Sequence, residues 1–132
     1  MEPTEILNTL TTSIEKLERS LEIARTKPEQ FHLVTLDYSM VVVPAGAGGL
    51  RLRQITGGLD EAIALPTTEA ATRAMEGWNT MLTIEQRTRG CLVEWSAGTV
   101  ILSTHRRNLV LLKAEVETAI AAAKLATEGG AQ

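Results

Sequence analysis

Apolar residues recur at alternating steps of three and four positions over residues 4–26, and this spacing constrains the fold more than any other feature of the sequence. The apolar stripe consists of Leu7, Leu10, Ile14, Leu17, Leu21 and Ala24. Such heptad spacing places one narrow apolar seam along an α-helix, which begins near Pro3 and ends before Pro28. A seam this narrow is expected to pack on another helix, in the same chain or in a partner.

A second seam with the same spacing lies in the predicted helix at residues 104–127. Its members are Leu109, Leu112, Val116, Ala119 and Ala123. The EGGAQ ending predicts a frayed tail at residues 129–132. Either Thr104 or Asn108 is a suitable N-cap. A cap at Thr104 would place the basic residues 105–107 in the first helical turn, where an anion is favoured instead, whereas a cap at Asn108 leaves them in the preceding loop.

The segment between these helices reads as strands and one helix. The predicted elements are, in order, strands at 31–43, 50–56 and 59–65, a helix at 67–82, and strands at 84–95 and 99–103. The glycine-rich loop that follows the first strand lacks the GK[ST] ending of a phosphate-binding loop, so we expect a simple connection there. The predicted order is α-β-β-β-α-β-β-α, which indicates a single α+β domain over residues 1–132, with an antiparallel sheet and long N- and C-terminal helices.

The composition excludes several classes of protein. A chain of 132 residues, 44% hydrophobic and 22% charged, suits one globular domain. The sequence contains no run of about eighteen apolar residues, so we expect no membrane span. The N-terminal segment lacks the pattern of a signal peptide, and the single cysteine, Cys91, has no disulfide partner, so we expect a cytoplasmic protein. A net charge of −3 and an aromatic content of 3% predict no nucleic-acid binding.

No arrangement of residues points to catalysis or to a metal. The conceivable pairs of nucleophile and base are Cys91 with His32 or His105, and Ser103 with His105. Cys91, however, lies in an apolar strand pattern, which is typical of a buried cysteine that acts as a small hydrophobic residue. Two isolated histidines without HxxxH or CxxC spacing predict no metal site, and no cofactor motif is present. The sequence therefore predicts a protein without enzymatic activity.

Arginine pairs are the most distinctive polar feature. Each pair occupies alternate positions of a predicted strand and so projects from one face: Arg51 and Arg53, then Arg87 and Arg89. If the two strands are neighbours, the four guanidinium groups form a basic surface that is extended by His105, Arg106 and Arg107. Such a surface would bind a small anionic or phosphorylated ligand through bidentate hydrogen bonds. The alternative is an ordinary solvated surface, on which the arginines pair with Glu85, Glu94 or the acidic first helix.

Three stretches resemble a known family, the class I chaperones of type III secretion systems. "AIALPTTEAATRAMEGWNTML" (62–82) resembles the middle helix of that family, which starts at a proline. "CLVEWSAGTVILS" (91–103) resembles its hairpin, and "NLVLLKAEVETAIAAAKLA" (108–126) resembles its closing amphipathic helix. The resemblance spans most of the chain in element order and rests on no diagnostic motif.

The resemblance implies a cytoplasmic homodimer without enzymatic activity that holds an extended segment of a protein partner in its grooves. Carried over to this sequence, the family's partner-binding surface falls on the first strands, at Val34, Leu36, Val41 and Val43. Two alternatives remain open. One is a binder of a small anionic ligand that uses the paired arginines, and the other is a phage-type inhibitor that blocks a host protein.

Overall fold

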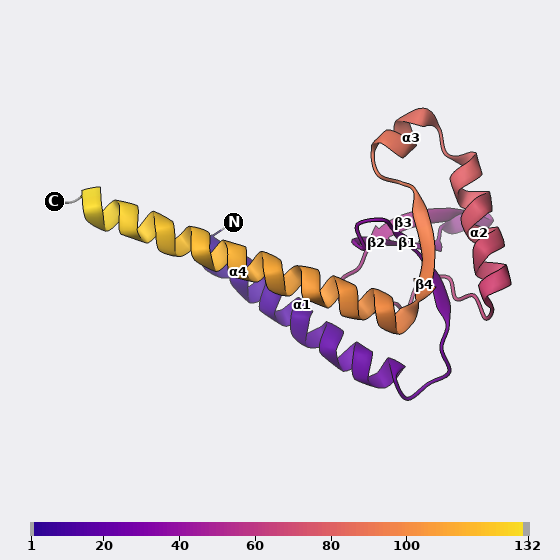
Figure 1. Ribbon diagram of the computed structural model, residues 1–132, viewed down its shortest axis with the longest axis horizontal. Helices are drawn as coiled ribbons and strands as arrows, with labels where there is room; N and C mark the ends of the chain where they lie inside the picture. The colour runs from indigo at the N-terminus through magenta and orange to yellow at the C-terminus, as the bar shows by residue number, and fades with distance from the viewer. Residues whose placement is uncertain (1, 131–132) are drawn as a thin grey trace.

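A four-stranded antiparallel sheet lies toward one end of the elongated molecule in the computed structural model, which describes residues 2–130 (Figure 1). The strands are β1 (Phe31–Thr35), β2 (Met40–Pro44), β3 (Leu50–Gln54) and β4 (Val93–Ala97), in the spatial order β3-β2-β1-β4. The helices are α1 (Pro3–Ala24), the 3₁₀ turn η1 (Gly46–Gly48), α2 (Thr68–Met81), α3 (Ile84–Thr88) and α4 (Gly98–Gly130). The predicted α+β class, with an antiparallel sheet and long terminal helices, is confirmed.

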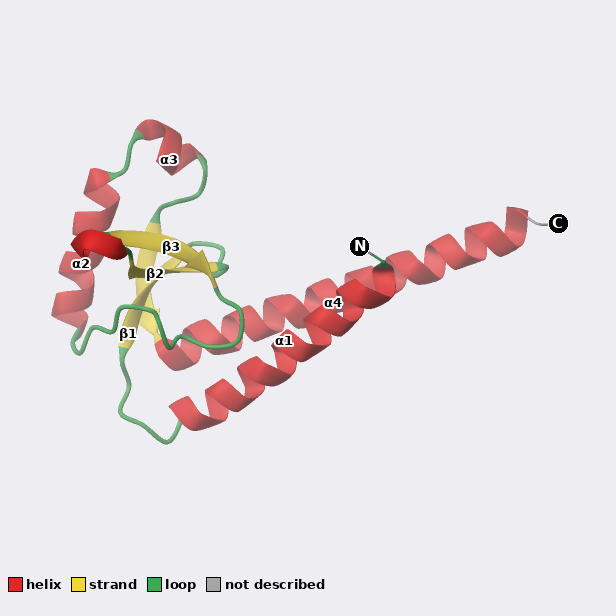
Figure 2. Cartoon of the chain, turned by 180° about the vertical axis from the view of Figure 1, so that it is seen from behind, coloured by secondary structure: helices red, strands yellow, loops and turns green. Residues whose placement is uncertain are grey.

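The two terminal helices lie side by side and form a long arm on one side of the sheet (Figures 1 and 2). At a rise of about 1.5 Å per residue, α4 is about 50 Å long and α1 about 33 Å. The N-terminal end of α1 lies beside the middle of α4, and the far end of α4 extends past α1 (Figure 2). As the heptad spacing predicts, α1 buries Leu10, Ile14, Leu17 and Leu21.

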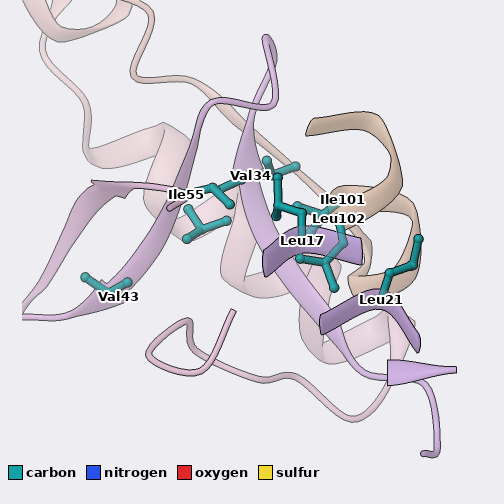
Figure 3. Packing of buried hydrophobic residues seen from close by; sticks show 8 residues of the cluster. Leu17, Leu21, Val34, Val43, Ile55, Ile101 and Leu102 are labelled. Carbon is teal, nitrogen blue, oxygen red and sulfur yellow. The ribbon is translucent and has the colours of Figure 1, made fainter. Parts of the chain in front are cut away.

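Both faces of the sheet are covered. On the face toward the arm, a cluster joins the two helices to the strands (Figure 3); it contains Leu17, Leu21, Val34, Val41, Val43, Ile55, Ile101 and Leu102. On the other face, α2 packs over a smaller cluster of Leu33, Val42 and Val93. Thr67 caps α2, because its side chain accepts a hydrogen bond from the amide of Ala70.

The predicted strand at 31–43 is two strands. A tight turn at residues 36–39 interrupts it, and the carboxylate of Asp37 holds that turn together. Its Oδ1 atom accepts hydrogen bonds from the hydroxyl groups of Thr35 and Ser39, at 2.8 and 2.7 Å. Tyr38 takes a φ angle of 59° there. The alternating pattern continued through the turn and therefore hid it.

Three other predicted strands are wrong in detail. The segment 59–65 contributes only a single bridge, from Leu65 to Phe31. Residues 84–88 form the short helix α3, because Thr83 and Gln86 make a reciprocal capping box. Residues 99–103 belong to α4, so one strand, β4, stands where two were expected. The apolar run 99–103 is helical because the buried residues of this part of α4 repeat at helical spacing. His105 follows Leu102 by three positions and Ile101 by four.

The start of α4 corrects both predicted caps. The helix begins at Gly98, directly after β4, rather than at Thr104 or Asn108. The carboxylate of Glu29 accepts hydrogen bonds from the Thr99 amide and hydroxyl, at 3.3 and 3.0 Å, and so supplies the negative charge that a helix N-terminus favours. The basic residues 105–107 lie inside the helix, beyond its first turn. Of the expected frayed tail, residues 129 and 130 belong to α4, and residues 131 and 132 lie outside the described part.

Candidate functional site

The predicted basic surface is not assembled as expected. Arg51 and Arg53 lie on β3, whereas Arg87 and Arg89 lie in and directly after the short helix α3, so the two pairs do not occupy neighbouring strands. Three arginines form ion pairs within the chain: Arg53 with Glu61, Arg89 with Glu85, and Arg106 with Glu18 of α1. Arg87 donates to the carbonyl oxygen of Asn79 at 2.8 Å. These contacts favour the ordinary-surface alternative for most of the arginines.

His105 is a structural residue rather than part of a basic surface. Its side chain is buried, and the ring nitrogens Nδ1 and Nε2 lie 3.0 and 3.1 Å from the carbonyl oxygens of Tyr38 and Ile55. The ring thus ties α4 to the turn before β2 and to the residue after β3. Arg107, two residues further along α4, is exposed.

The residues carried over from the chaperone resemblance lie in different environments. Val34, Val41 and Val43 are buried in the cluster beneath the arm, with exposed fractions of 0–3%. Leu36 lies in the turn between β1 and β2 and is 60% exposed. A partner would reach the three valines only if the arm moved away from the sheet. Leu36 is the one of the four that is accessible in this structure.

The side chains considered for catalysis or metal binding lie in packed, hydrogen-bonded parts of the fold. Cys91 is half-buried, and its carbonyl oxygen accepts a hydrogen bond from the indole N–H of Trp78 at 2.9 Å. His32 is buried and lies 2.9 Å, through Nδ1, from the carbonyl oxygen of Ile63. Within residues 2–130, no group of three or more His, Cys, Asp or Glu side chains is placed to hold a metal ion.

Acidification is expected to destabilise the fold through the buried histidines. Burial lowers the pKa of His32 and of His105 below the ordinary value of 6.5, against opposing contributions from nearby carbonyl groups and from Glu29 or Asp37. The folded state then binds fewer protons than the unfolded state, so stability present above about pH 6.5 is lost as the pH falls through the lowered pKa values. Thermal melts from pH 7 to pH 5 should therefore show a melting temperature that falls as the pH falls.

A matched variant tests the contribution of His32. His32→Asn keeps an N–H donor near the position of Nδ1 but removes the titrating ring, so its melting temperature should fall less steeply over the same pH range. Equal slopes for the two proteins would contradict the assignment to His32.

An apolar groove lies on the α2 face of the sheet, between α2 and β3. Its volume is about 780 Å³. The floor comes from β1 and β3, and the wall from one face of α2; the principal apolar residues are Leu33, Leu50, Leu52, Ala74, Trp78 and Met81. Around this groove and the neighbouring α3, large apolar side chains are exposed: Leu50 at 48%, Met81 at 82% and Ile84 at 84%.

The groove borders an open strand edge. β3 is the end strand of the sheet, and it pairs with β2 on one side only. Two hydrogen bonds flank that ladder, from the Ile55 amide to the Ser39 carbonyl and from the Ala45 amide to the Gly49 carbonyl. By the alternation of an antiparallel ladder, the backbone groups of the odd-numbered residues face β2. The N–H and C=O groups of Leu50, Leu52 and Gln54 therefore face outward.

Sequence reasoning placed binding on the first strands and missed this groove. The signals that mark it are Gly77, which leaves room on the face of α2 that lines the groove, and the apolar Met81 at the end of that helix.

No protein-family model, no curated protein and no solved structure matches this chain. None of the helices within residues 2–130 combines the length and the apolar character that a membrane span requires. The function is therefore inferred from the geometry of the chain's own residues.

Proposed function

We propose that this chain is a binding protein without enzymatic activity, which holds an extended segment of another protein along β3. The observation that carries the proposal is the juxtaposition of the open edge of β3 with the apolar groove beside it. An extended segment that adds to a sheet edge gains affinity from main-chain hydrogen bonds and specificity from pockets that take alternate side chains. Both elements of that mode of recognition are present here.

The chemistry of the bound segment follows from the two faces of β3. The outward N–H and C=O groups of Leu50, Leu52 and Gln54 supply the main-chain hydrogen bonds. Side chains of the added strand that lie on the same face as Leu52 enter the groove, which favours large apolar residues at every second position. The positions between them lie on the face of Arg51, whose side chain is exposed, and this favours acidic residues there.

We propose a cytoplasmic location and a protein partner for this chain. The single cysteine suits a reducing compartment. A chaperone-like role and inhibition of a host protein both rely on such a binding surface, and they differ in the partner rather than in the chemistry of binding.

Selection from a displayed library of random peptides tests the site. The full-length chain is expected to enrich peptides with apolar residues at alternating positions, and the affinity of an enriched synthetic peptide is then measured by fluorescence anisotropy. Gly77→Trp fills the groove from the face of α2 that also carries Ala74 and Met81, and it should weaken binding by about tenfold or more. An enriched peptide that binds equally well to Gly77→Trp, or a library that yields no enrichment, would overturn the proposal.

Gly77→Ala serves as the matched control, and it carries a prediction of its own. A β-carbon built at Gly77 meets no described atom within 4 Å, and the residue lies inside α2. Alanine should therefore raise the free energy of unfolding by about 0.5–1 kcal/mol, because glycine loses more conformational freedom in a helix. Chemical denaturation measures this gain, while peptide affinity should stay unchanged. A loss of stability would show that the backbone at this position needs glycine.

A further inference from the structure

The outer half of α4 is apolar on more faces than a single neighbouring helix can cover. Of the 18 residues from Leu109 to Ala126, 13 are apolar. One stripe of this segment is half-buried, and it includes Leu109, Val116 and Ile120. Residues 121–128 are exposed throughout. A helix that is apolar on several faces is normally buried on several faces, so this segment lacks a covering surface.

Another heptad seam, distinct from the one predicted through Leu109 and Val116, runs along the part of α4 that α1 leaves uncovered. Its steps of three and four positions connect Leu111, Ala114, Thr118, Ala121 and Leu125, all of which are exposed. The two leucines are 57% and 69% exposed. The hydroxyl of Thr118 donates to the Ala114 carbonyl oxygen at 2.9 Å, so its polar atom is already satisfied by the helix itself. This outer seam is therefore suited to packing against another helix.

The outer seam is complementary to itself in the antiparallel direction. With a two-fold axis at Thr118, Leu111 lies opposite Leu125 of a second copy, and Ala114 lies within one residue, about 1.5 Å along the axis, of Ala121 of that copy. The small alanines flank the centre and let the helices approach closely, while the leucines close the two ends. The same register places the exposed Arg107 opposite the exposed Glu128 of the second copy. Each dimer would contain this charge pair twice.

We propose that the occupant of the outer seam is a second copy of this chain, packed antiparallel through α4. A closed two-fold interface uses the same patch on both molecules, as this register does. A parallel dimer would instead place Arg107 beside Arg107 and Glu128 beside Glu128, so the charges favour the antiparallel arrangement. The contact from Arg107 to Glu128 extends over about 31 Å of helix at 1.5 Å per residue. The interface lies on the arm and does not involve the groove beside β3.

Sedimentation velocity over a range of protein concentrations tests the interface. The full-length chain is expected to sediment as a dimer, and Ala121→Glu should raise the dimer dissociation constant by about tenfold or more, because it places a charge in the close-packed part of the seam. Ala126→Glu is the matched control: Ala126 is exposed on the same helix but lies away from the outer seam, so the dimer should persist. A monomer for the unaltered chain, or equal effects of the two variants, would overturn the proposal.

A charge exchange tests the antiparallel register. Arg107→Glu alone and Glu128→Arg alone should each weaken the dimer, since each places like charges opposite each other. The double variant restores opposite charges, and its dissociation constant should return to within about threefold of the original value, given the small energies of exposed ion pairs. A double variant as weak as the sum of the single variants would reject this register.

Disulfide trapping in a Cys91→Ser background distinguishes the two directions. Thr118→Cys lies at the two-fold axis and should form a disulfide-linked dimer under oxidation, whereas Leu111→Cys should not, because it faces Leu125 of the second copy. Efficient cross-linking of Leu111→Cys would indicate a parallel dimer and contradict the proposal. Loss of the dimer leaves peptide binding at β3 testable in the monomer, so the two proposals can fail separately.

Discussion

Replacing Leu17 by alanine is expected to lower the free energy of unfolding by about 3–4 kcal/mol, the range typical of a fully buried leucine. Leu17 is 0% exposed and lies in the cluster that joins α1, α4 and the sheet (Figure 3). Truncation removes apolar contacts from all three elements and leaves a cavity that helices anchored to the sheet do not readily close. Chemical denaturation monitored by circular dichroism, at one fixed protein concentration, measures the loss.

Leu36→Ala is the control for this substitution. The Leu36 side chain is 60% exposed in the turn between β1 and β2, so its truncation should change the free energy of unfolding by less than about 0.5 kcal/mol. Similar losses for the two variants would contradict the position assigned to Leu17 in the core.

Replacing Asn79 by alanine is expected to cost about 2–3 kcal/mol, although the side chain is only half-buried. The amide of Asn79 makes two hydrogen bonds to the backbone of Val93 on β4. Its Nδ2 donates to the Val93 carbonyl oxygen at 2.8 Å, and its Oδ1 accepts from the Val93 amide at 2.9 Å. The side chain thus takes the place of a neighbouring strand at the edge of the sheet. Alanine leaves both groups of the buried Val93 without these partners.

Two further variants separate the amide from the helix that carries it. Asn79→Asp keeps an acceptor for the Val93 amide but loses the donor, so its stability should lie between those of the original protein and the alanine variant. Asn8→Ala, at an exposed position of α1, should change stability by less than about 0.5 kcal/mol. Equal stability of the Asn79→Ala variant and the unaltered chain would show that water replaces the amide at this edge.

The first and the middle helix, α1 and α2, were predictable because their burial repeats with a single period. The seam of α1 faces α4 along most of its length, and the packed face of α2 repeats at steps of three and four positions, at Ala71, Ala74, Met75 and Trp78. In both cases the partner surface is continuous, so local periodicity and tertiary packing agree.

The errors arose where tertiary contacts decide between patterns that look alike. The run Thr99–Ser103 is apolar enough for a strand, but the buried positions Ile101 and Leu102 continue into the helix that packs on α1. Residues 36–39 keep the alternation of a strand, yet the Asp37 carboxylate closes a turn within them. A short apolar run does not by itself separate strand from helix.

The candidate site was the least predictable part. The arginine pairs were visible in the sequence, but their ion pairs with Glu61, Glu85 and Glu18 depend on how distant segments meet. The groove beside β3 depends on α2 leaving that side of the sheet open and on the turn from α2 into α3. Neither condition is encoded in a local motif.

The junction between β4 and α4 has a consequence for how a dimer would engage its target. Ala97 ends the strand and Gly98 begins the helix, with no linker between them, and a β-carbon at Gly98 would lie 3.3 Å from Nε2 of His32. The direction of α4 is therefore set by the sheet. With the proposed two-fold axis at Thr118, the two junctions are about 60 Å apart along the helix axis, at 1.5 Å per residue. Each β3 groove is carried by the sheet at its junction, so such a dimer would hold its two binding sites at a fixed separation. It would gain avidity only for targets whose two segments match the distance between the grooves.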